Sequence, residues 1–573
     1  MSTVIFDIET NGIEDFKHLS DLKVVHCIAL DAGDGVKVYH GKHIAEALEI
    51  LKKAKKIVGH NIMGFDLRAL SKVYGYEPTW ETSVVDTLVA ARLCWPDVKE
   101  DDFIKLERGF PKQLIGKHSL EAWGHRLGVL KGDFKSNNSF DKFTDEMAEY
   151  CAKDVDVTKA LYAKILGEEP TMMSMALEHD FAAIIQEQER SGIPFNERAA
   201  TDLYTTLTAE KDALSRRLVD LFPPKVVQLK TKKKYIPFNP GSRLQIAEGL
   251  MAKHNWRPSE FTPDGRPKVD EEVLSSLEYE EAKLLSKYLL IEKRIGQLGD
   301  GKEGWIKLSK NGKIFGRVNT NGAVTGRCSH SGPNMAQVPS VKSPYGKECR
   351  ALFYAPAGFK MVGVDASGLE LRCLAHYMAK YDDGVYAKTV VSGDIHTMNQ
   401  QAAGLQTRDQ AKVFIYALVY GAGDEKIGKI IGGSRQEGKR VKDRFLSKVP
   451  ALKRLKDDIE RAMETRGYLI GLDGRKLRPR SKHAALNTLL QSAGAILMKQ
   501  ATVLAWRRFK KAKIEVTQVA HVHDEIQYIV KEDNAKQTGQ LCVESIRLSG
   551  EVFKFRCPLD GEFRIGGNWA ETH

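Results

Sequence analysis

The chain has 573 residues, 42% of them hydrophobic and 28% charged, the balance of a globular protein with room for three or four domains. It has no run of roughly 18 apolar residues and no basic leader, so we expect no membrane contact and no export. A net charge of +12 suits a polyanionic partner. The eight cysteines stand singly without zinc spacing, and we expect them to be reduced and mostly structural.

Three stretches of different character follow one another. Residues 1 to about 185 alternate β-rich runs with helical stretches, which predicts an α/β domain. Residues from about 197 to 300 are helix-dominated and charged around a basic, proline-bearing segment at 223–237, which predicts two helical hairpins with a flexible tip. Beyond 301, β-like segments at 360–365 and 519–523 bracket a long helical stretch. We therefore expect a sheet domain interrupted by a helical one.

A first group of acidic residues lies in the N-terminal α/β part. Asp7 and Glu9 are two apart on a predicted strand, so both side chains point to one face and could hold a hard divalent cation. Asp66 follows a later strand, and Tyr150 and Asp154 lie one helical turn apart. Four carboxylates and a tyrosine could bind two metal ions and aim a water at a phosphodiester. A solvated strand end is the alternative for Asp7 and Glu9 taken alone.

This ordered set resembles the proofreading 3′→5′ exonucleases of the DEDD type with a tyrosine in the last motif. The resemblance implies an RNase H-like exonuclease domain in which Asp7, Glu9, Asp66 and Asp154 are metal ligands. It also implies that Tyr150 orients the nucleophilic water. We interpret Asp86 as structural, because a carboxylate at that place can cap or pack a helix.

A second acidic pair lies in the C-terminal half. Asp365 ends an apolar run before a predicted helix, and Asp524 lies in an apolar–polar alternation that predicts a tight hairpin with the aspartate at its turn. Two aspartates from neighbouring strands could bind the metal pair of a phosphoryl transfer. Ordinary turn aspartates are the alternative for either one alone.

Between these aspartates, a four-residue repeat marks one face of a predicted helix. Arg408, Lys412, Tyr416 and Tyr420 place two cations and then two aromatic rings along one stripe, followed by Gly421. A nucleotide presents phosphates at one end and a base at the other. The stripe matches that shape, with cations for the triphosphate and a ring for stacking.

These three segments resemble motifs A, B and C of family A DNA polymerases, and residues 322–327 and 333–339 resemble the segment that precedes them. The branch resembled most is the phage T7 type, judged by residues 365–376, 421–428 and 483–491, and the resemblance covers essentially the whole chain. It implies an α/β multidomain protein that joins the exonuclease domain to a right-hand polymerase. The implied domains are an exonuclease at 1–185, a thumb at 186–300, a palm at 301–378 and 488–573, and fingers at 379–487.

The resemblance also implies roles for single residues. Asp365 and Asp524 would hold the polymerase metals, and Tyr416 would stack on the nucleotide sugar and base. Glu370 would meet Tyr416 to exclude a 2′-hydroxyl, and a tyrosine at 416 implies ready acceptance of dideoxynucleotides. The remaining implied groups are Arg408, Lys412 and His396 for the triphosphate, Arg327, Gln491 and His523 for minor-groove acceptors at the primer end, and Tyr420 with Gly421 for closing the fingers.

The implied cofactor is Mg²⁺, two ions per site, for which Mn²⁺ could substitute. The implied partners are primer–template DNA and deoxynucleoside triphosphates, in the cytoplasm of an infected bacterial host, and a phage helicase–primase is left open. The loop at about 222–238 is too short for the insertion that binds host thioredoxin in the T7 type, so we do not expect thioredoxin. The chain lacks room for a 5′ nuclease domain, which favours replication over primer removal. The loop lysines could contact duplex phosphates or stay solvated; they are Lys225, Lys230, Lys232, Lys233 and Lys234.

Two alternative functions remain at this point. A single-subunit RNA polymerase shares the palm and a similar nucleotide helix, but Glu370 and the exonuclease motifs argue against it. A nucleic-acid-binding protein with an active exonuclease and a dead polymerase half would lack a ligand or nucleotide contact, and none is missing.

Overall fold

The computed structural model describes residues 3–129, 140–228 and 232–573, which divide into two compact units. The mixed α/β, multidomain organisation expected from the sequence is confirmed. In the described part of the chain, no helix is both long enough and apolar enough to cross a bilayer. The first unit comprises Met1–Ser191, Val318–His330 and Gly358–Ile565, and the second comprises Gly192–Arg317, Ser331–Ala357 and Gly566–His573.

A five-stranded sheet in the order β3-β2-β1-β4-β5 opens the first unit. Strand β2 runs antiparallel to β1 and β3, whereas β1, β4 and β5 are parallel to one another. This order, with one reversed strand, is the RNase H-like arrangement that the sequence predicts. The strands are β1 (Thr3–Thr10), β2 (Val25–Asp31), β3 (Val36–His40), β4 (Lys56–Gly59) and β5 (Ser83–Asp86).

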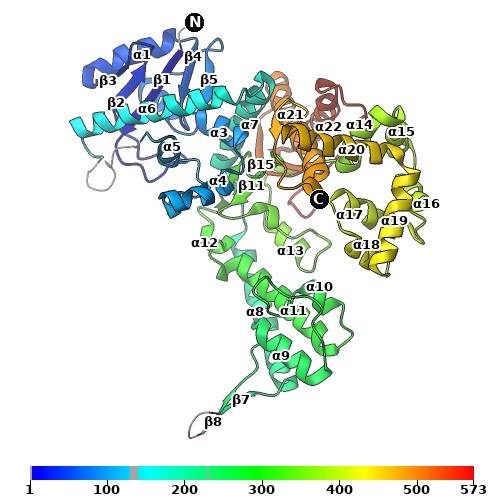
Figure 1. Ribbon diagram of the computed structural model, residues 1–573. Helices are drawn as coiled ribbons and strands as arrows, with labels where there is room; N and C mark the ends of the chain where they lie inside the picture. The colour runs from blue at the N-terminus through cyan, green and yellow to red at the C-terminus, as the bar shows by residue number, and fades with distance from the viewer. Residues whose placement is uncertain (1–2, 130–139, 229–231) are drawn as a thin grey trace. The chain divides into compact units, whose positions relative to one another are not determined.

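The alternation of side chains along β1 determines which face of this sheet carries Asp7 and Glu9. Phe6 and Ile8 pack with the residues of α1 and α2 on one face, whereas Ile5 packs with residues of α6 on the other. Asp7 and Glu9 share the parity of Ile5, so they face α6, which lies across the sheet in Figure 1. The helices are α1 (Ile44–Lys53), α2 (Asp66–Tyr74), α3 (Thr87–Cys94), α4 (Val98–Lys105), α5 (Leu120–Leu127), α6 (Asp145–Gly167) and α7 (Met172–Ser191).

A four-stranded sheet in the order β15-β16-β12-β17 forms the second sheet of the same unit. Its strands β12 and β15 bracket the helical stretch, as the sequence predicts, and its helices α14, α21 and α22 share one large apolar core with that stretch. Hairpin β15-β16 turns within two residues, because Val522 pairs with Glu525. These elements are β12 (Phe359–Ala366), α14 (Leu369–Asp382), α21 (Ala485–Ala512), β15 (Val516–Val522), β16 (Glu525–Lys531), α22 (Ala535–Val552) and β17 (Gly561–Gly566).

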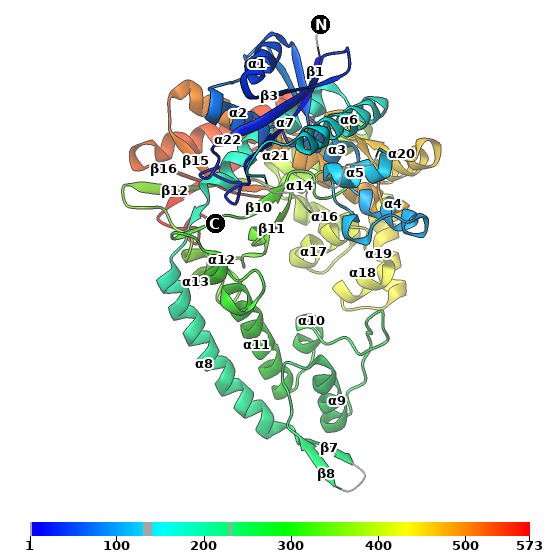
Figure 2. The ribbon, with the colours of Figure 1, turned by 90° about the vertical axis from the view of Figure 1, so that its left-hand side faces the viewer.

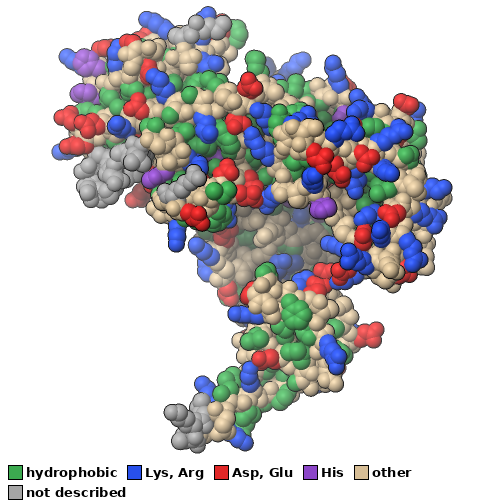
Figure 3. Space-filling model, in the orientation of Figure 1, with side chains coloured by type: hydrophobic (Ala, Val, Ile, Leu, Met, Phe, Trp, Pro, Cys, Tyr) green, Lys and Arg blue, Asp and Glu red, His purple; other side chains and the backbone are tan. Residues whose placement is uncertain are grey.

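One of the helices inserted between β12 and β15 begins at a well-defined N-terminal cap. Helix α17 starts at a capping box in which Thr407 accepts from the backbone of Gln410 and the Gln410 side chain accepts from the backbone of Thr407. Lys and Arg side chains are numerous over these helices on the face shown in Figure 3. The inserted elements are α15 (Val385–Ser392), α16 (Ile395–Ala403), α17 (Arg408–Val419), α18 (Asp424–Ile430), α19 (Arg435–Lys448), α20 (Pro450–Arg466), β13 (Leu469–Ile470) and β14 (Lys476–Leu477).

The second unit is helical, with α8 and α11 packed side by side (Figure 2). The described residues of its basic segment form two paired strands in which Val226 pairs with Tyr235, and the tip between them lies outside the described residues. β-Branched and aromatic residues in both arms favour strand pairing, and Lys230 lies outside the described residues. The elements are β6 (Ile193–Pro194), α8 (Glu197–Leu221), β7 (Lys225–Gln228), β8 (Lys233–Ile236), α9 (Arg243–His254), α10 (Glu271–Ser275), α11 (Glu280–Ile295), α12 (Trp305–Leu308), β9 (Lys313–Ile314) and α13 (Gly346–Ala351).

The core between α17 and α19 provides a test of the inserted helices. The fully buried ring of Phe445 meets Phe414 edge-on, with 5.3 Å between centroids. We expect Phe445→Ala to lower the free energy of unfolding by about 3–5 kcal/mol, because the truncation leaves a cavity. Phe445→Leu is the matched control and should cost less. Chemical denaturation checks this, and equal costs for the two variants would contradict it.

Candidate active sites

The first acidic cluster lies where β1 faces α6. Oxygen atoms of Asp7 and Glu9 and the sulfur of Cys151 all lie within 4.8 Å of one another. The Cys151 Sγ is 3.8 Å from the Asp7 Oδ2. The two carboxylates are half-buried and point to one face, as their spacing predicts. Carboxylate oxygens are the donors that hard divalent cations prefer, so this donor set fits a metal ion.

The other carboxylates of this cluster come from the two helices beside the sheet. Asp66 is the first residue of α2, and Tyr150 and Asp154 lie one turn apart on α6; all three are buried. Burial, together with the nearby charges of Asp86 and Asp154, raises the pKa of Asp66 to about 7. Negative groups crowded in this way favour a cation among them.

Cys151 lies within this cluster, although the sequence led us to expect a structural cysteine. It stands directly after Tyr150 on α6, and its thiol also approaches the Asp7 carbonyl oxygen at 3.5 Å. Burial, followed by the neighbouring Cys27 thiol and the Asp7 charge, raises the pKa of the Cys151 thiol well above its usual value. Its position between the tyrosine and the last aspartate of one helix was the available signal.

Asp86 is the structural carboxylate that the sequence predicts. It is the N-cap of α3, and its Oδ1 accepts from the backbone of Leu88 at 2.9 Å and of Asn61 at 2.8 Å. Its Oδ2 accepts from the Met63 backbone at 3.1 Å. Asp86 therefore fixes the loop that leads to Asp66.

The second acidic pair lies on adjacent strands of the four-stranded sheet. Asp365 is near the end of β12 and pairs in register with Glu525 of β16, and Asp524 is in the hairpin turn just before Glu525. The Ala366 backbone donates to the Asp524 carbonyl at 3.2 Å, so the two segments are in direct contact. Burial raises the pKa of the Asp524 carboxyl, although His523 and Arg327 oppose the shift. Two carboxylates from neighbouring strand ends fit a metal ion here as well.

Three basic side chains gather at the start of α17. His396 lies on α16, which packs against α17. Burial lowers the pKa of His396, and the positive charges of Arg408 and Lys412 lower it further. The Arg408 Nε donates to Asp394 at 2.8 Å. Asp394 also caps α16, and the sequence analysis did not identify it. The cluster presents several cations, but Arg408 is already held by a carboxylate.

Glu370, expected beside Tyr416, makes its hydrogen bond with the next aromatic residue of the stripe. In the described part of the chain, Tyr420 donates its hydroxyl proton to the Glu370 Oε1, and no such bond joins Tyr416 to Glu370. Arg327 pairs with the same carboxylate oxygen at 3.2 Å. Tyr416 remains near both acids, since burial and then the charges of Glu370 and Asp524 raise its pKa.

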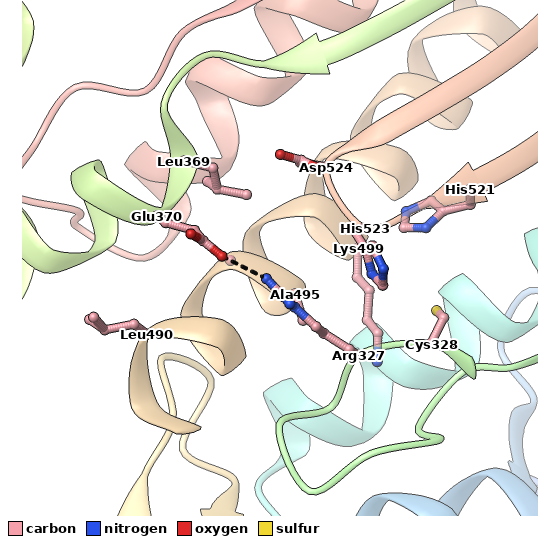
Figure 4. A pocket seen from close by; sticks show the side chains of 11 residues that line it. Arg327, Cys328, Leu369, Glu370, Leu490, Ala495, Lys499, His521, His523 and Asp524 are labelled. Carbon is pink, nitrogen blue, oxygen red and sulfur yellow. Dashed lines mark hydrogen bonds and ion pairs between the residues drawn. The ribbon is translucent and has the colours of Figure 1, made fainter. Parts of the chain in front are cut away.

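A cavity of about 30 Å³ connects several of these groups. Figure 4 shows Arg327 reaching Glu370, with Asp524 and His523 at the hairpin beside them. A cavity of this size has room for water. Gln491, also expected at this site, is half-buried on α21 and does not line the cavity.

The fold and the two acidic clusters define a polymerase that carries an exonuclease domain. The family described as DNA polymerase family A matches residues 215–571, and the family described as 3'-5' exonuclease matches residues 1–168. The chain belongs to DNA polymerase family A, which confirms the resemblance seen in the sequence and excludes the RNA polymerase alternative. It is a DNA-directed DNA polymerase with a 3′→5′ exonuclease domain.

Two curated relatives match over their whole length. The DNA-directed DNA polymerase of Enterobacteria phage T3 is 35% identical over 712 aligned residues, and that of Escherichia phage T7 is 34% identical over 709. Both alignments cover 100% of this chain and 100% of the relative. A solved structure described as the POL domain of Pol1 from M. smegmatis in complex with DNA primer-template and dNTP has a TM-score of 0.76 at 18% identity. It covers 99% of this chain and 95% of that chain, and it supports the fold alone.

The contrast between Asp86 and Asp66 provides a test of the first cluster. Asp86→Asn removes an acceptor from a buried cap, so we expect it to lower the free energy of unfolding by about 1–3 kcal/mol and to leave measurable exonuclease activity. Asp66→Asn should abolish degradation of a labelled oligonucleotide while leaving the melting temperature unchanged or higher, because it relieves repulsion. The assignment fails if the two substitutions show the reverse pattern.

Proposed function

We propose that this chain replicates DNA in an infected bacterial cell, adding deoxynucleotides to a primer 3′-hydroxyl at one site and removing mispaired ones at the other. One observation carries the proposal: two acidic clusters lie on two different sheets of one chain, each beside groups suited to its own step. Asp365 and Asp524 serve the polymerase site. Asp7, Glu9, Asp66 and Asp154 serve the exonuclease site.

At the polymerase site, Asp365 and Asp524 would hold two Mg²⁺ ions. When bound, these ions supply acidification of the primer hydroxyl and neutralisation of phosphate charge; Mn²⁺ could take their place. The adjacent strand ends, in contact through Ala366 and Asp524, support this assignment because they bring both carboxylates to one edge of the sheet.

The basic cluster of α17 receives the triphosphate. Arg408, Lys412 and His396 stand close together, and phosphate oxygens are stronger acceptors of their charge than one exposed carboxylate. We propose that Arg408 exchanges Asp394 for the nucleotide. Tyr416 then stacks on the sugar and base, and as a tyrosine it accepts dideoxynucleotides.

Glu370 and Tyr420 control access to this site. Glu370 accepts from Tyr420 and pairs with Arg327, and the Arg327–Glu370 pair lines the small cavity beside Asp524. Nucleotide entry requires Tyr420 to leave Glu370, which then meets Tyr416 and excludes a 2′-hydroxyl. Tyr420 and Gly421 close over the templating base. Arg327, Gln491 and His523 contact minor-groove acceptors at the primer end, where N3 and O2 report pairing geometry.

At the exonuclease site, the four carboxylates would hold a second pair of Mg²⁺ ions and Tyr150 would orient the attacking water. The position of Tyr150 supports this role, because its ring is buried on α6 one turn before Asp154 and faces the side of β1 that carries Asp7. Removal of the 3′ nucleotide then needs only hydrolysis of one phosphodiester.

We propose the domain assignment implied by the sequence. The first sheet and its helices, with residues 1–185, form the exonuclease, and residues 186–300 form the thumb. The second sheet belongs to the palm at 301–378 and 488–573, and the inserted helices at 379–487 are the fingers. The lysine-rich hairpin of β7 and β8 is a candidate contact for duplex phosphates, since three of its described lysines follow one another at 232–234 and are exposed.

Single substitutions should separate the two activities. We expect Asp365→Ala to slow extension of a primed template at least about a thousandfold, since metal-held charge is worth several kcal/mol. It should leave 3′ degradation intact. Asp7→Ala should do the opposite. Products resolved on a gel with and without deoxynucleotides check this, and unchanged extension by Asp365→Ala would favour a dead polymerase half.

Host thioredoxin is not proposed as a partner. The alignments to the phage relatives span 712 and 709 residues although this chain has 573, so each contains more than a hundred positions with no counterpart here. The short connection between α8 and α9, which contains the β7-β8 hairpin, supports placing one such gap there. A phage helicase–primase remains a candidate partner.

A processivity assay tests this expectation. Primer extension on a long single-stranded template, with a trap that prevents rebinding, should give products of equal length with and without host thioredoxin. An enzyme known to respond to the same thioredoxin preparation is the control. A several-fold increase in product length would show that the partner was wrongly dismissed.

A further inference from the structure

Helix α7 packs against elements of both proposed active sites. It contacts α3, next to the exonuclease cluster, and it contacts α21 and β15, beside the polymerase pocket. Its buried residues include charged and polar side chains as well as apolar ones, among them Glu178 and Gln188. Gln188 accepts from the Gln518 side chain of β15 at 2.9 Å. A helix built for packing alone would not need these buried polar groups.

Glu178 is fully buried and is the centre of a balanced ionic network. Its Oε1 accepts from Arg475 at 2.6 Å and from Lys499 at 2.7 Å, and its Oε2 accepts from Asn321 at 2.7 Å. Arg475 also pairs with Asp473 at 2.6 Å, so two cations face two carboxylates. Buried ion pairs of this kind add little net stability because desolvation offsets their attraction. Their fixed hydrogen-bond geometry is better suited to positioning.

Two of these partners connect Glu178 to the proposed primer-end contacts. Asn321 precedes Gly322, whose backbone donates to the Arg327 carbonyl at 3.0 Å, so the Glu178 bond fixes the loop that carries Arg327. Lys499 lines the same cavity as Arg327 and His523 (Figure 4).

Phe181 adds a third support one turn further along α7. Its ring lies 5.5 Å from the Lys499 ammonium and 5.0 Å from the ring of His521, which also lines the cavity. The wall behind the primer-end contacts thus rests on α7.

His179, which directly follows Glu178, contacts the loop region of the proposed exonuclease site. Its Nδ1 lies 2.7 Å from the Met175 carbonyl, which can only accept, so Nδ1 carries the proton. Its Nε2 therefore accepts from the Asp86 backbone at 2.9 Å. Asp86 in turn holds the loop before Asp66 through two backbone hydrogen bonds.

We propose that α7 is a shared support of the two sites, with Glu178 a positioning residue for the primer-end contacts and His179 a positioning residue for the exonuclease loop. The inference rests on the proposed function. Neither residue touches DNA. Glu178 and His179 are adjacent on one helix. The residue that positions the primer-end contacts is therefore joined directly to the residue that positions the exonuclease loop.

Glu178→Gln tests the polymerase side. Loss of the carboxylate weakens the hold on Arg327 and Lys499, so a matched primer end should leave the polymerase site more readily. Without deoxynucleotides, we expect degradation of a matched primer–template to rise about tenfold, the change that one charge-assisted hydrogen bond supports. Degradation of a single-stranded oligonucleotide should stay unchanged, a readout that a general loss of structure would not preserve.

Charge balance is the control for folding. Glu178→Gln alone leaves two cations opposite one carboxylate, whereas Glu178→Gln combined with Lys499→Met restores equal charges in the buried network. The double variant should recover the melting temperature but keep the raised degradation of matched primers. If the single variant does not fold, the double variant carries the test.

His179→Leu is the matched control on the neighbouring position. It removes the acceptor for the Asp86 backbone, so single-strand degradation should fall about tenfold while primer extension is unchanged. The proposal is overturned if folded Glu178 variants degrade matched primers at the wild-type rate, or if they lose degradation of single and double strands equally. A wild-type chain that neither extends nor degrades would instead refute the proposed function.

Discussion

Strand geometry positions the proposed metal-binding carboxylates of both sites. On β1, the two-residue repeat turns Asp7 and Glu9 toward α6 while Phe6 and Ile8 enter the opposite core. In the second sheet, the pairing of β12 with β16 puts Asp365 beside the turn that carries Asp524. A slip of one residue in either strand would send these carboxylates into an apolar layer. The positions of these carboxylates therefore depend on the register of β1 and of the β12–β16 pair.

The buried charged side chains form two kinds of cluster, one with an excess of carboxylates and one with equal numbers of cations and carboxylates. At the exonuclease cluster, carboxylates outnumber the cations around them, and burial with neighbouring negative charge raises the pKa of Asp66 to about 7. Around Glu178, two cations match two carboxylates, and although burial raises its pKa, Lys499 and Arg475 hold the pKa of this acid below its usual value. An unmatched cluster suits a site that receives cations. A network with equal numbers of cations and carboxylates suits a position where side chains are held in place.

The sequence predicts what is local and misses what is brought together by folding. The motif carboxylates, the hairpin turn at Asp524 and the helix of Arg408 follow from spacing and turn chemistry, and all are present. The contacts of Asp394 with Arg408 and of Tyr420 with Glu370 join separate elements, so no spacing within one motif indicates them. The paired strands at 225–228 and 233–236 were taken for a loop, because lysines occupy several of their positions and the pairing of Val226 with Tyr235 joins two separate segments.

The helical insertion between β12 and β15 also constrains how the molecule is made. The five strands of the first sheet are complete within the first 86 residues, whereas β12 must wait for β16, which begins at Glu525. During synthesis the ribosome thus releases every strand of the first sheet long before the second sheet can form. A nascent chain interrupted within the inserted helices would therefore carry all five strands of the first sheet without the complete second sheet.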